Sequence, residues 1–195
     1  MKILILGGFL GSGKTTFLLK LAEYLTKNVT DNKTPVAVIE NEIGEISVDS
    51  SVLGNYRVKD IMSGCICCSL AGEIFPAIKE MQEDLNPEYI VIEATGMAYP
   101  ANIASTIEEY FPESIRTVCL ADASRWDELM EYMDIFTSNQ LKGSDVILLN
   151  KTDLVSAEDT ARICKEIEEL VPGVDVIPMS AKSEINNMEE ILGGK

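Results

Sequence analysis

A chain of 195 residues can form one domain with a substantial core, and its 46% apolar and 25% charged residues are an ordinary globular balance. The formal charge of −16 argues against nucleic acid and anionic membrane surfaces as partners; it fits protein or cationic partners, and a solvated acidic surface explains it equally well. No apolar run approaches a membrane span and no signal-peptide cleavage site follows the apolar N-terminus, so we expect a cytoplasmic protein.

The first sixteen residues carry a phosphate-loop motif. Residues 2–6 are an apolar run of strand length, followed by Gly-x-x-x-x-Gly-Lys-Thr with every fixed position matched. In such a loop, backbone N–H groups and the N-terminus of the next helix face one anion, which disfavours a glycine-rich turn without a ligand. We expect Lys14 to reach the β- and γ-phosphates and Thr15 to bind Mg²⁺. The residues predicted to hold a nucleoside triphosphate are Gly8, Gly11, Ser12, Gly13, Lys14, Thr15 and Thr16.

Strand-like and helix-like segments alternate along the chain. Helical spacing of apolar residues predicts helices over residues 15–27, 70–85, 100–110, 126–141 and 157–170, and a last helix that ends near 192. Continuous apolar runs predict strands over residues 2–6, 35–39, 56–62, 89–92, 114–121, 146–149 and 174–177. Such strands are buried on both faces, which predicts an α/β fold of the P-loop NTPase class. We expect a single domain over residues 1–195, a mostly parallel sheet with helices on both faces, and ligands at the carboxyl ends of the strands.

An acidic loop follows the second predicted strand, where phosphate-loop proteins usually keep their first switch. It reads Glu40-Asn-Glu-Ile-Gly-Glu-Ile-Ser-Val-Asp49. Further along, Cys65, Cys67 and Cys68 bring three thiols within four residues, and thiolates can converge on one soft cation. A fourth ligand would be water, a partner group or a carboxylate, and the candidate carboxylates are Glu40, Glu42 and Glu45.

The cysteines also allow explanations other than metal binding. A redox-active pair or small buried cysteines would also explain the cluster at residues 65–68. Cys119 and Cys164 fall on a predicted strand and a predicted helix and are expected in the core. Five cysteines is an odd count, which disfavours a disulfide framework, and the absence of histidine removes imidazole as a base or metal ligand.

Glu93 and Gly96 follow the fourth predicted strand and form the candidate catalytic set together with Lys14. Glu93 is placed to position the attacking water or to hold the Mg²⁺ shell, and the N–H of Gly96 is placed to sense the γ-phosphate. A strand-end glutamate can also be simply solvated, so this role depends on its spacing and context. No obvious glutamine follows Gly96, which predicts slow intrinsic hydrolysis that a partner could accelerate.

Two late loops indicate guanine rather than adenine. Asn150, Lys151 and Asp153 follow a predicted strand, and an aspartate can accept hydrogen bonds from guanine N1–H and the 2-amino group. The lysine stem can lie along the base. Ser180, Ala181 and Lys182 follow the next strand, where a backbone N–H can bond guanine O6. Together these signals predict a GTP-binding protein and disfavour an ATPase.

Five motifs in this order resemble the CobW-type GTPases, relatives of the UreG and HypB nickel chaperones. They are Gly-Gly-Phe-Leu-Gly-Ser-Gly-Lys-Thr-Thr, Glu-Asn-Glu-Ile-Gly-Glu, Gly-Cys-Ile-Cys-Cys, Glu-Ala-Thr-Gly-Met-Ala-Tyr-Pro and Asn-Lys-Thr-Asp. The resemblance implies a metallochaperone or metal-insertase GTPase that binds Zn²⁺ or Co²⁺ according to its GTP or GDP state. It also implies that the three clustered cysteines bind metal with Glu40 and Glu45, and that Glu42 or Asp49 belongs to the Mg²⁺-linked switch.

The same resemblance implies the partners. A client metalloprotein, or a protein of cobalt and corrinoid metabolism, is expected to receive the metal, and a homodimer is a further possibility. Family members commonly carry a second, C-terminal domain, often rich in histidine, which this sequence lacks, so a separate protein is an expected substitute. The rival hypothesis is a regulatory GTPase that gates a partner, with structural or redox-sensitive cysteines. A P-loop kinase is disfavoured by the guanine signals.

Overall fold

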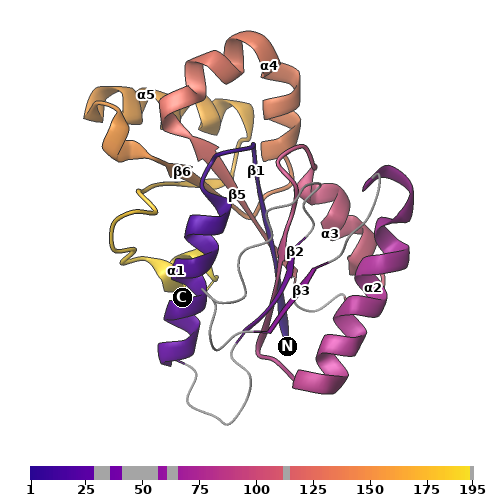
Figure 1. Ribbon diagram of the computed structural model, residues 1–195. Helices are drawn as coiled ribbons and strands as arrows, with labels where there is room; N and C mark the ends of the chain where they lie inside the picture. Colours follow the sequence, from indigo (N-terminus) through magenta and orange to yellow (C-terminus); the bar gives the residue numbers. More distant parts are fainter. Residues whose placement is uncertain (29–35, 41–56, 61–65, 112–114, 194–195) are drawn as a thin grey trace.

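The computed structural model describes residues 1–28, 36–40, 57–60, 66–111 and 115–193 (Figure 1). In this part of the chain, seven parallel strands form one sheet in the order β3-β2-β4-β1-β5-β6-β7. The strands are β1 (Lys2–Gly8), β2 (Val36–Glu40), β3 (Arg57–Asp60), β4 (Tyr89–Glu93), β5 (Ile115–Asp122), β6 (Val146–Asn150) and β7 (Asp175–Pro178). The predicted α/β fold with a parallel sheet is therefore confirmed.

The helices cover both faces of this sheet. They are α1 (Lys14–Asn28), α2 (Ile66–Leu85), α3 (Pro100–Glu108), α4 (Trp126–Leu141), α5 (Ala157–Leu170) and α6 (Met188–Ile191), with the short 3-10 turns η1 (Ala123–Arg125) and η2 (Thr152–Leu154). None of the helices described is long and apolar enough to cross a membrane.

Alternation along the strands divides the core into two layers. In β1, Leu4 and Leu6 pack with α1 and α6 on one face, whereas Ile3 and Ile5 pack with α2 and α3 on the other. That second face continues over β5 and β6, where α4 and α5 close around the buried Trp126. Successive side chains of a strand point to opposite faces, so a strand covered on both sides must be apolar throughout.

The structure corrects the predicted start of the second helix. We expected this helix to begin near residue 70, with Gly72 and Pro76 in its opening turn, but α2 begins at Ile66 and contains Pro76 in its interior. A proline there removes one helical hydrogen bond. Ile74, Ile78 and neighbouring apolar residues are buried against the sheet, and their burial offsets this loss. Cys67 and Cys68 consequently lie in the first turn of a helix.

Several strands run further than their apolar cores predict. Because parallel neighbours continue to pair, the ladder includes the polar residues at the strand ends: Glu40 lies in register with Glu93, and Asp122 with Asn150. The polar residues with candidate functions are therefore fixed by sheet hydrogen bonding at the carboxyl end of the sheet.

Candidate nucleotide-binding site

The loop between β1 and α1 has the backbone shape of a phosphate cradle. Gly8, Gly11 and Gly13 have positive φ angles of 136°, 78° and 99°, which side chains with a Cβ rarely adopt. A Cβ at Gly8 would lie 2.5 Å from the carbonyl oxygen of Leu120, and one at Gly13 would collide with the Asn150 amide. Only glycine allows the loop to curl this tightly against β5 and β6.

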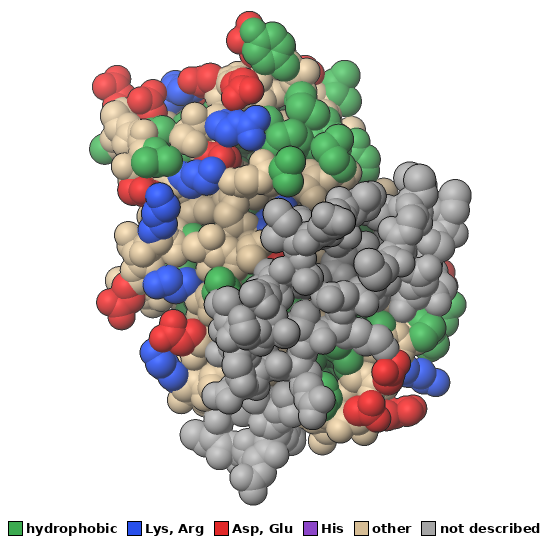
Figure 2. All heavy atoms as spheres, viewed as in Figure 1, with side chains coloured by type: hydrophobic (Ala, Val, Ile, Leu, Met, Phe, Trp, Pro, Cys, Tyr) green, Lys and Arg blue, Asp and Glu red, His purple; other side chains and the backbone are tan. Residues whose placement is uncertain are grey.

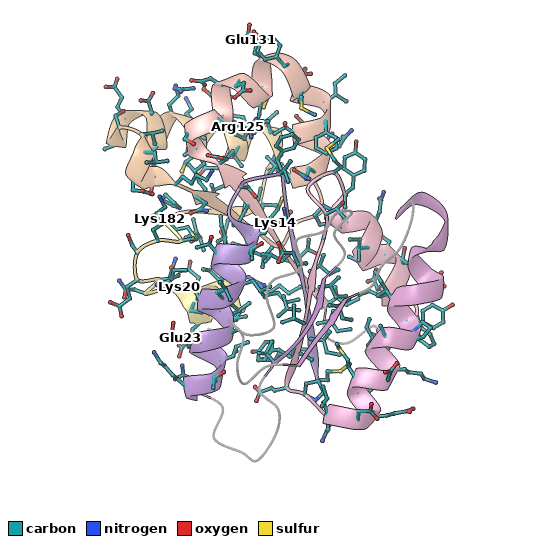
Figure 3. All side chains as sticks on the ribbon, viewed as in Figure 1. Lys14, Lys20, Glu23, Arg125, Glu131 and Lys182 are labelled. Atoms are coloured by element: carbon teal, nitrogen blue, oxygen red, sulfur yellow. The ribbon has the colours of Figure 1, made fainter. Side chains whose placement is uncertain are left out.

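Lys14 points into this loop rather than to solvent (Figure 3). Its side chain is only 4% exposed, and Nζ donates a hydrogen bond to the carbonyl oxygen of Gly8 at 3.2 Å. An ammonium beside a curled glycine loop at the N-terminus of α1 could hold a polyanion. This is the position predicted for a lysine that binds phosphates.

Thr15 and Glu93 meet across the site, although 78 positions separate them in sequence. The Thr15 hydroxyl donates to Oε1 of Glu93 at 3.0 Å, and Glu93 is only 2% exposed. A hydroxyl and a carboxylate side by side are hard oxygen donors, which Mg²⁺ prefers. The residues fit that ion: Thr15 and Glu93 would hold it, and it would neutralise phosphate charge. Glu93 is buried, so the solvated alternative is wrong.

Gly96 supports the outer side of the phosphate loop. A Cβ at Gly96 would lie 2.7 Å from the backbone nitrogen of Leu10, so the loop after β4 and the phosphate loop are in close contact. Gln140 of α4 is buried and donates through Nε2 to the carbonyl oxygens of Gly96, at 3.1 Å, and Ala98, at 3.0 Å. Sequence reasoning missed Gln140; the available signal was a glutamine among the apolar positions of α4.

Asn150 joins the two halves of the site. Its Nδ2 donates to the carbonyl oxygen of Ser12 at 2.7 Å, and its Oδ1 accepts from the backbone N–H of Ala181 at 2.8 Å. Both side-chain groups are thus bonded to protein. Asn150 therefore aligns the phosphate loop with the loop at residues 180–182, a positioning role, and the Ala181 N–H is already used.

Residues 150–153 and 180–182, here called the base loops, are held by contacts to the rest of the protein. Lys151 has a positive φ of 65°, and its ammonium bonds to Asp122 at 2.6 Å. Asp153 is exposed, and the adjacent Ser180 hydroxyl lowers the pKa of its carboxyl group. Asp153 is therefore ionised at neutral pH and able to accept hydrogen bonds from guanine. Thr152 fixes the turn by donating through Oγ1 to the carbonyl oxygen of Met179 at 3.0 Å.

The predicted transition-metal residues fall mostly outside the described residues. Glu42, Glu45, Asp49 and Cys65 lie outside them, and for Glu40, Cys67 and Cys68 only the backbone is described. Among the described side chains, no group of three or more Cys, Asp or Glu residues is arranged to hold a metal. The metal site therefore stays a prediction.

The other two cysteines are packing residues, as predicted. Cys119 is fully buried in β5, and burial raises the pKa of its thiol to about 12. Cys164 on α5 is partly buried against the core that surrounds Trp126. A thiol that stays protonated is a poor metal ligand and a poor nucleophile.

Comparison with known proteins places these features in one family. Residues 2–178 match the family described as "CobW/HypB/UreG, nucleotide-binding domain". The chain is 36% identical over 166 residues to the zinc chaperone YjiA of Escherichia coli (strain K12), which covers 78% of this chain and 49% of that protein. It is 27% identical over 235 residues to zinc-regulated GTPase metalloprotein activator 1 of Dictyostelium discoideum, covering 98% of this chain and 48% of that protein.

Solved structures show the same fold. The hydrogenase maturation factor HypB of Archaeoglobus fulgidus superimposes with a TM-score of 0.69 at 17% identity, covering 98% of this chain and 87% of that one. A Zn(II)-bound triple mutant of the YjiA GTPase superimposes with a TM-score of 0.67 at 25% identity, covering 98% and 60%. The chain thus spans about half the length of the curated relatives it matches.

Proposed function

Because the chain belongs to the CobW/HypB/UreG family of nucleotide-binding domains, we propose that it binds and slowly hydrolyses GTP and uses the nucleotide state to control a bound Zn²⁺ or Co²⁺ ion. The observation that carries this proposal is the contact between the Thr15 hydroxyl and the buried Glu93 carboxylate beside Lys14. Its geometry suits a Mg²⁺-bound triphosphate, whose β- and γ-phosphates would face the phosphate loop. Relatives named zinc chaperones support the metal as cargo.

The chain's own residues have separate tasks in hydrolysis. The loop N–H groups and Lys14 bind the phosphates, Thr15 and Glu93 hold Mg²⁺, and the buried Gln140 keeps Gly96 against the phosphate loop. Asn150 holds the base loops in register with the phosphate loop. Positioning and charge neutralisation provide most of the catalysis in phosphoryl transfer, which these contacts can supply.

The cargo metal would be held by Cys65, Cys67 and Cys68 with a carboxylate from Glu40, Glu42 or Glu45, and Asp49 or Glu42 would serve the Mg²⁺-linked switch. Two backbone observations support this. Glu40 ends β2 in register with both Glu93, the proposed Mg²⁺ ligand, and Asp60. α2 begins at Ile66, directly before Cys67 and Cys68. Metal and nucleotide would then alter each other's affinity reciprocally.

The partner of this switch would be a client metalloprotein, including one of cobalt or corrinoid metabolism, with a second copy or a separate domain-like protein as further partners. A regulatory GTPase that gates a partner's conformation is the second candidate. Exposed apolar side chains favour it: they are Leu10 in the phosphate loop, Met97 after β4, and Tyr132 and Ile135 on α4. Figure 2 shows hydrophobic side chains gathered on the side where α4 lies. Exposed apolar patches are typical of protein–protein contacts.

Replacing Cys67 and Cys68 together with serine is expected to abolish thiolate-bound metal while nucleotide binding persists. The measurement is anaerobic titration of the reduced full chain with Co²⁺, in the presence of Mg·GTP analogue, Mg·GDP or no nucleotide. Thiolate ligation gives charge-transfer absorption, so the wild-type spectrum should change with nucleotide and the variant should lack it.

Cys164→Ser provides the matched control, because Cys164 is a helical cysteine on α5 and is not part of the predicted metal motif. It should keep the cobalt spectrum. If the wild-type chain binds no cobalt through thiolates in any of the three nucleotide states, the metal switch is contradicted. GTP-dependent partner binding that survives in the Cys67 and Cys68 double variant would then favour the regulatory GTPase.

Replacing Glu93 with glutamine is expected to lower kcat for GTP by about 10²-fold, the typical effect of removing one preorganised charge-stabilising group. The amide can still accept the Thr15 hydrogen bond but removes the negative charge that would hold Mg²⁺. The Mg²⁺ concentration needed for half-maximal hydrolysis should rise as well. Glu88→Gln is the control, because Glu88 precedes the same strand at the opposite end of the sheet. Equal effects of the two substitutions would rule out the assigned role.

A further inference from the structure

Asp122 is a buried carboxylate that the motifs of the family site do not include. It ends β5 in register with Asn150 of β6 and is only 2% exposed. Oδ2 accepts a hydrogen bond from Nζ of Lys151 at 2.6 Å. Oδ1 accepts from the backbone N–H of Ser124 at 3.0 Å and from its hydroxyl at 2.6 Å. Each oxygen of the carboxylate therefore has its own partner.

This arrangement fixes a side chain that would otherwise be mobile. A lysine has large rotamer freedom, and an exposed ion pair seldom holds it in one conformation. Here the acceptor, Asp122, is desolvated. The side chain of Lys151 is 27% exposed, so the buried carboxylate sets its position while part of the lysine side chain remains accessible to solvent. The backbone of Lys151 is also in the left-handed region, with φ of 65°, a strain that functional sites commonly contain.

The same carboxylate connects the base loop with the phosphate loop. Ser124 belongs to the turn η1, whose last residue, Arg125, donates from Nη1 to the carbonyl oxygen of Leu10 at 3.4 Å. The Arg125 guanidinium also lies over the Phe9 ring, 5.6 Å from its centroid. Figure 3 labels Arg125 near the start of α4 and Lys14 at the start of α1. Asp122 thus lies between Lys151 and the turn that contacts the tip of the phosphate loop.

We propose that Asp122 is a positioning residue for guanine-nucleotide binding, which holds the Lys151 stem along the face of the purine ring. This inference rests on the proposed binding of GTP. It assigns Asp122 as the residue that fixes the conformation of Lys151 before the nucleotide binds. Asp153 would recognise the edge of the base, whereas the Asp122–Lys151 pair would support its face. The pair should therefore contribute to the affinity for any purine nucleotide that Asp153 does not reject, and not for guanine nucleotides alone.

Asp122→Asn tests this role in the full chain. The amide keeps an acceptor for Ser124 but presents a donor to the Lys151 ammonium, so the anchor is lost. Calorimetric titration should show GDP and GTP binding about ten-fold weaker, which corresponds to about 1.4 kcal/mol. ITP lacks the 2-amino group that Asp153 accepts from but has the same ring face, so its affinity should fall by the same factor. KM should rise while kcat at saturating GTP stays unchanged.

Two further variants separate positioning from stability. Ser124→Ala removes one hydrogen bond from the same carboxylate but leaves the Ser124 backbone N–H and the Lys151 anchor, so nucleotide affinity should fall much less than in Asp122→Asn. Lys151→Met removes the anchored side chain at its partly exposed end, and adding Asp122→Asn to it should cause no further loss of affinity. If Asp122→Asn alone fails to fold, the affinity of the Lys151→Met variant still tests the anchored side chain.

The outcomes are distinct. Additive losses in the double variant, unchanged affinity in Lys151→Met, or an equal loss in Ser124→Ala would overturn the positioning role and make Asp122 a structural residue. A wild-type chain that binds none of these nucleotides would instead overturn the proposed function.

Discussion

Lys14→Met is expected to lower kcat/KM for GTP by about 10²–10³-fold, the effect of removing one preorganised charge from a site where phosphate charge develops. The Lys14 ammonium lies inside the phosphate loop, bonded to the carbonyl oxygen of Gly8, and is almost fully buried. Methionine has a similar shape and no charge, so the loop can keep its fold. Single-turnover hydrolysis of Mg·GTP by the purified chain measures the effect.

The same substitution should separate function from stability. Burying an ammonium is costly, and an apolar side chain of similar size removes this cost, so the free energy of unfolding should not decrease. Lys20→Met, a partly buried lysine further along α1 and outside the phosphate loop, is the control and should leave both quantities unchanged (Figure 3). A variant that hydrolyses GTP at the wild-type rate would exclude Lys14 from the site, and a large loss of stability would make its role structural.

Asn150→Ala is expected to reduce stability and nucleotide binding together. The substitution leaves the carbonyl oxygen of Ser12 and the N–H of Ala181 without their buried partner. Two such groups should cost about 3 kcal/mol of unfolding free energy. For a chain of this size the melting temperature should fall by about 10 °C. Because the phosphate and base loops lose their alignment, GTP affinity should fall at temperatures where the variant is still folded.

Thermal unfolding followed by circular dichroism, and nucleotide titration at low temperature, measure the two effects separately. Asn139→Ala is the control, because Asn139 accepts a hydrogen bond from Lys142 on the exposed end of α4. It should change neither quantity appreciably. If Asn150→Ala were as stable as the Asn139 variant, the two buried backbone groups would have found other partners and the bridging role would be wrong.

The strand and helix pattern was predictable because both signals are local. The 3.6-residue spacing gave α5 with its observed bounds, Ala157–Leu170, and α4 as Trp126–Leu141. The start of α2 was mispredicted because Gly72 and Pro76 are unfavourable inside a helix by local rules, whereas burial of the apolar face decides the outcome. Burial depends on what the helix packs against, and no local pattern contains that information.

The site divides in the same way. The phosphate loop follows from its sequence, because glycine conformation, lysine charge and the following helix are properties of adjacent residues. The roles of Gln140, Asp122 and Arg125 depend on contacts across 44, 29 and 115 positions of sequence. Asp122 had only the weak local signal of an aspartate two residues before a serine, a common turn pattern.

The sequence by itself determined the fold class and the phosphate loop and predicted a preference for guanine, because each depends on residue types at fixed local spacing. Only the tertiary structure decided which side chains of these motifs are bonded to protein and hold the loops. Asn150 belongs to a recognition motif in sequence, yet both of its side-chain groups are bonded to protein. Glu93 became a neighbour of Thr15 only because β4 pairs with β1, which places two distant residues at the same end of one sheet.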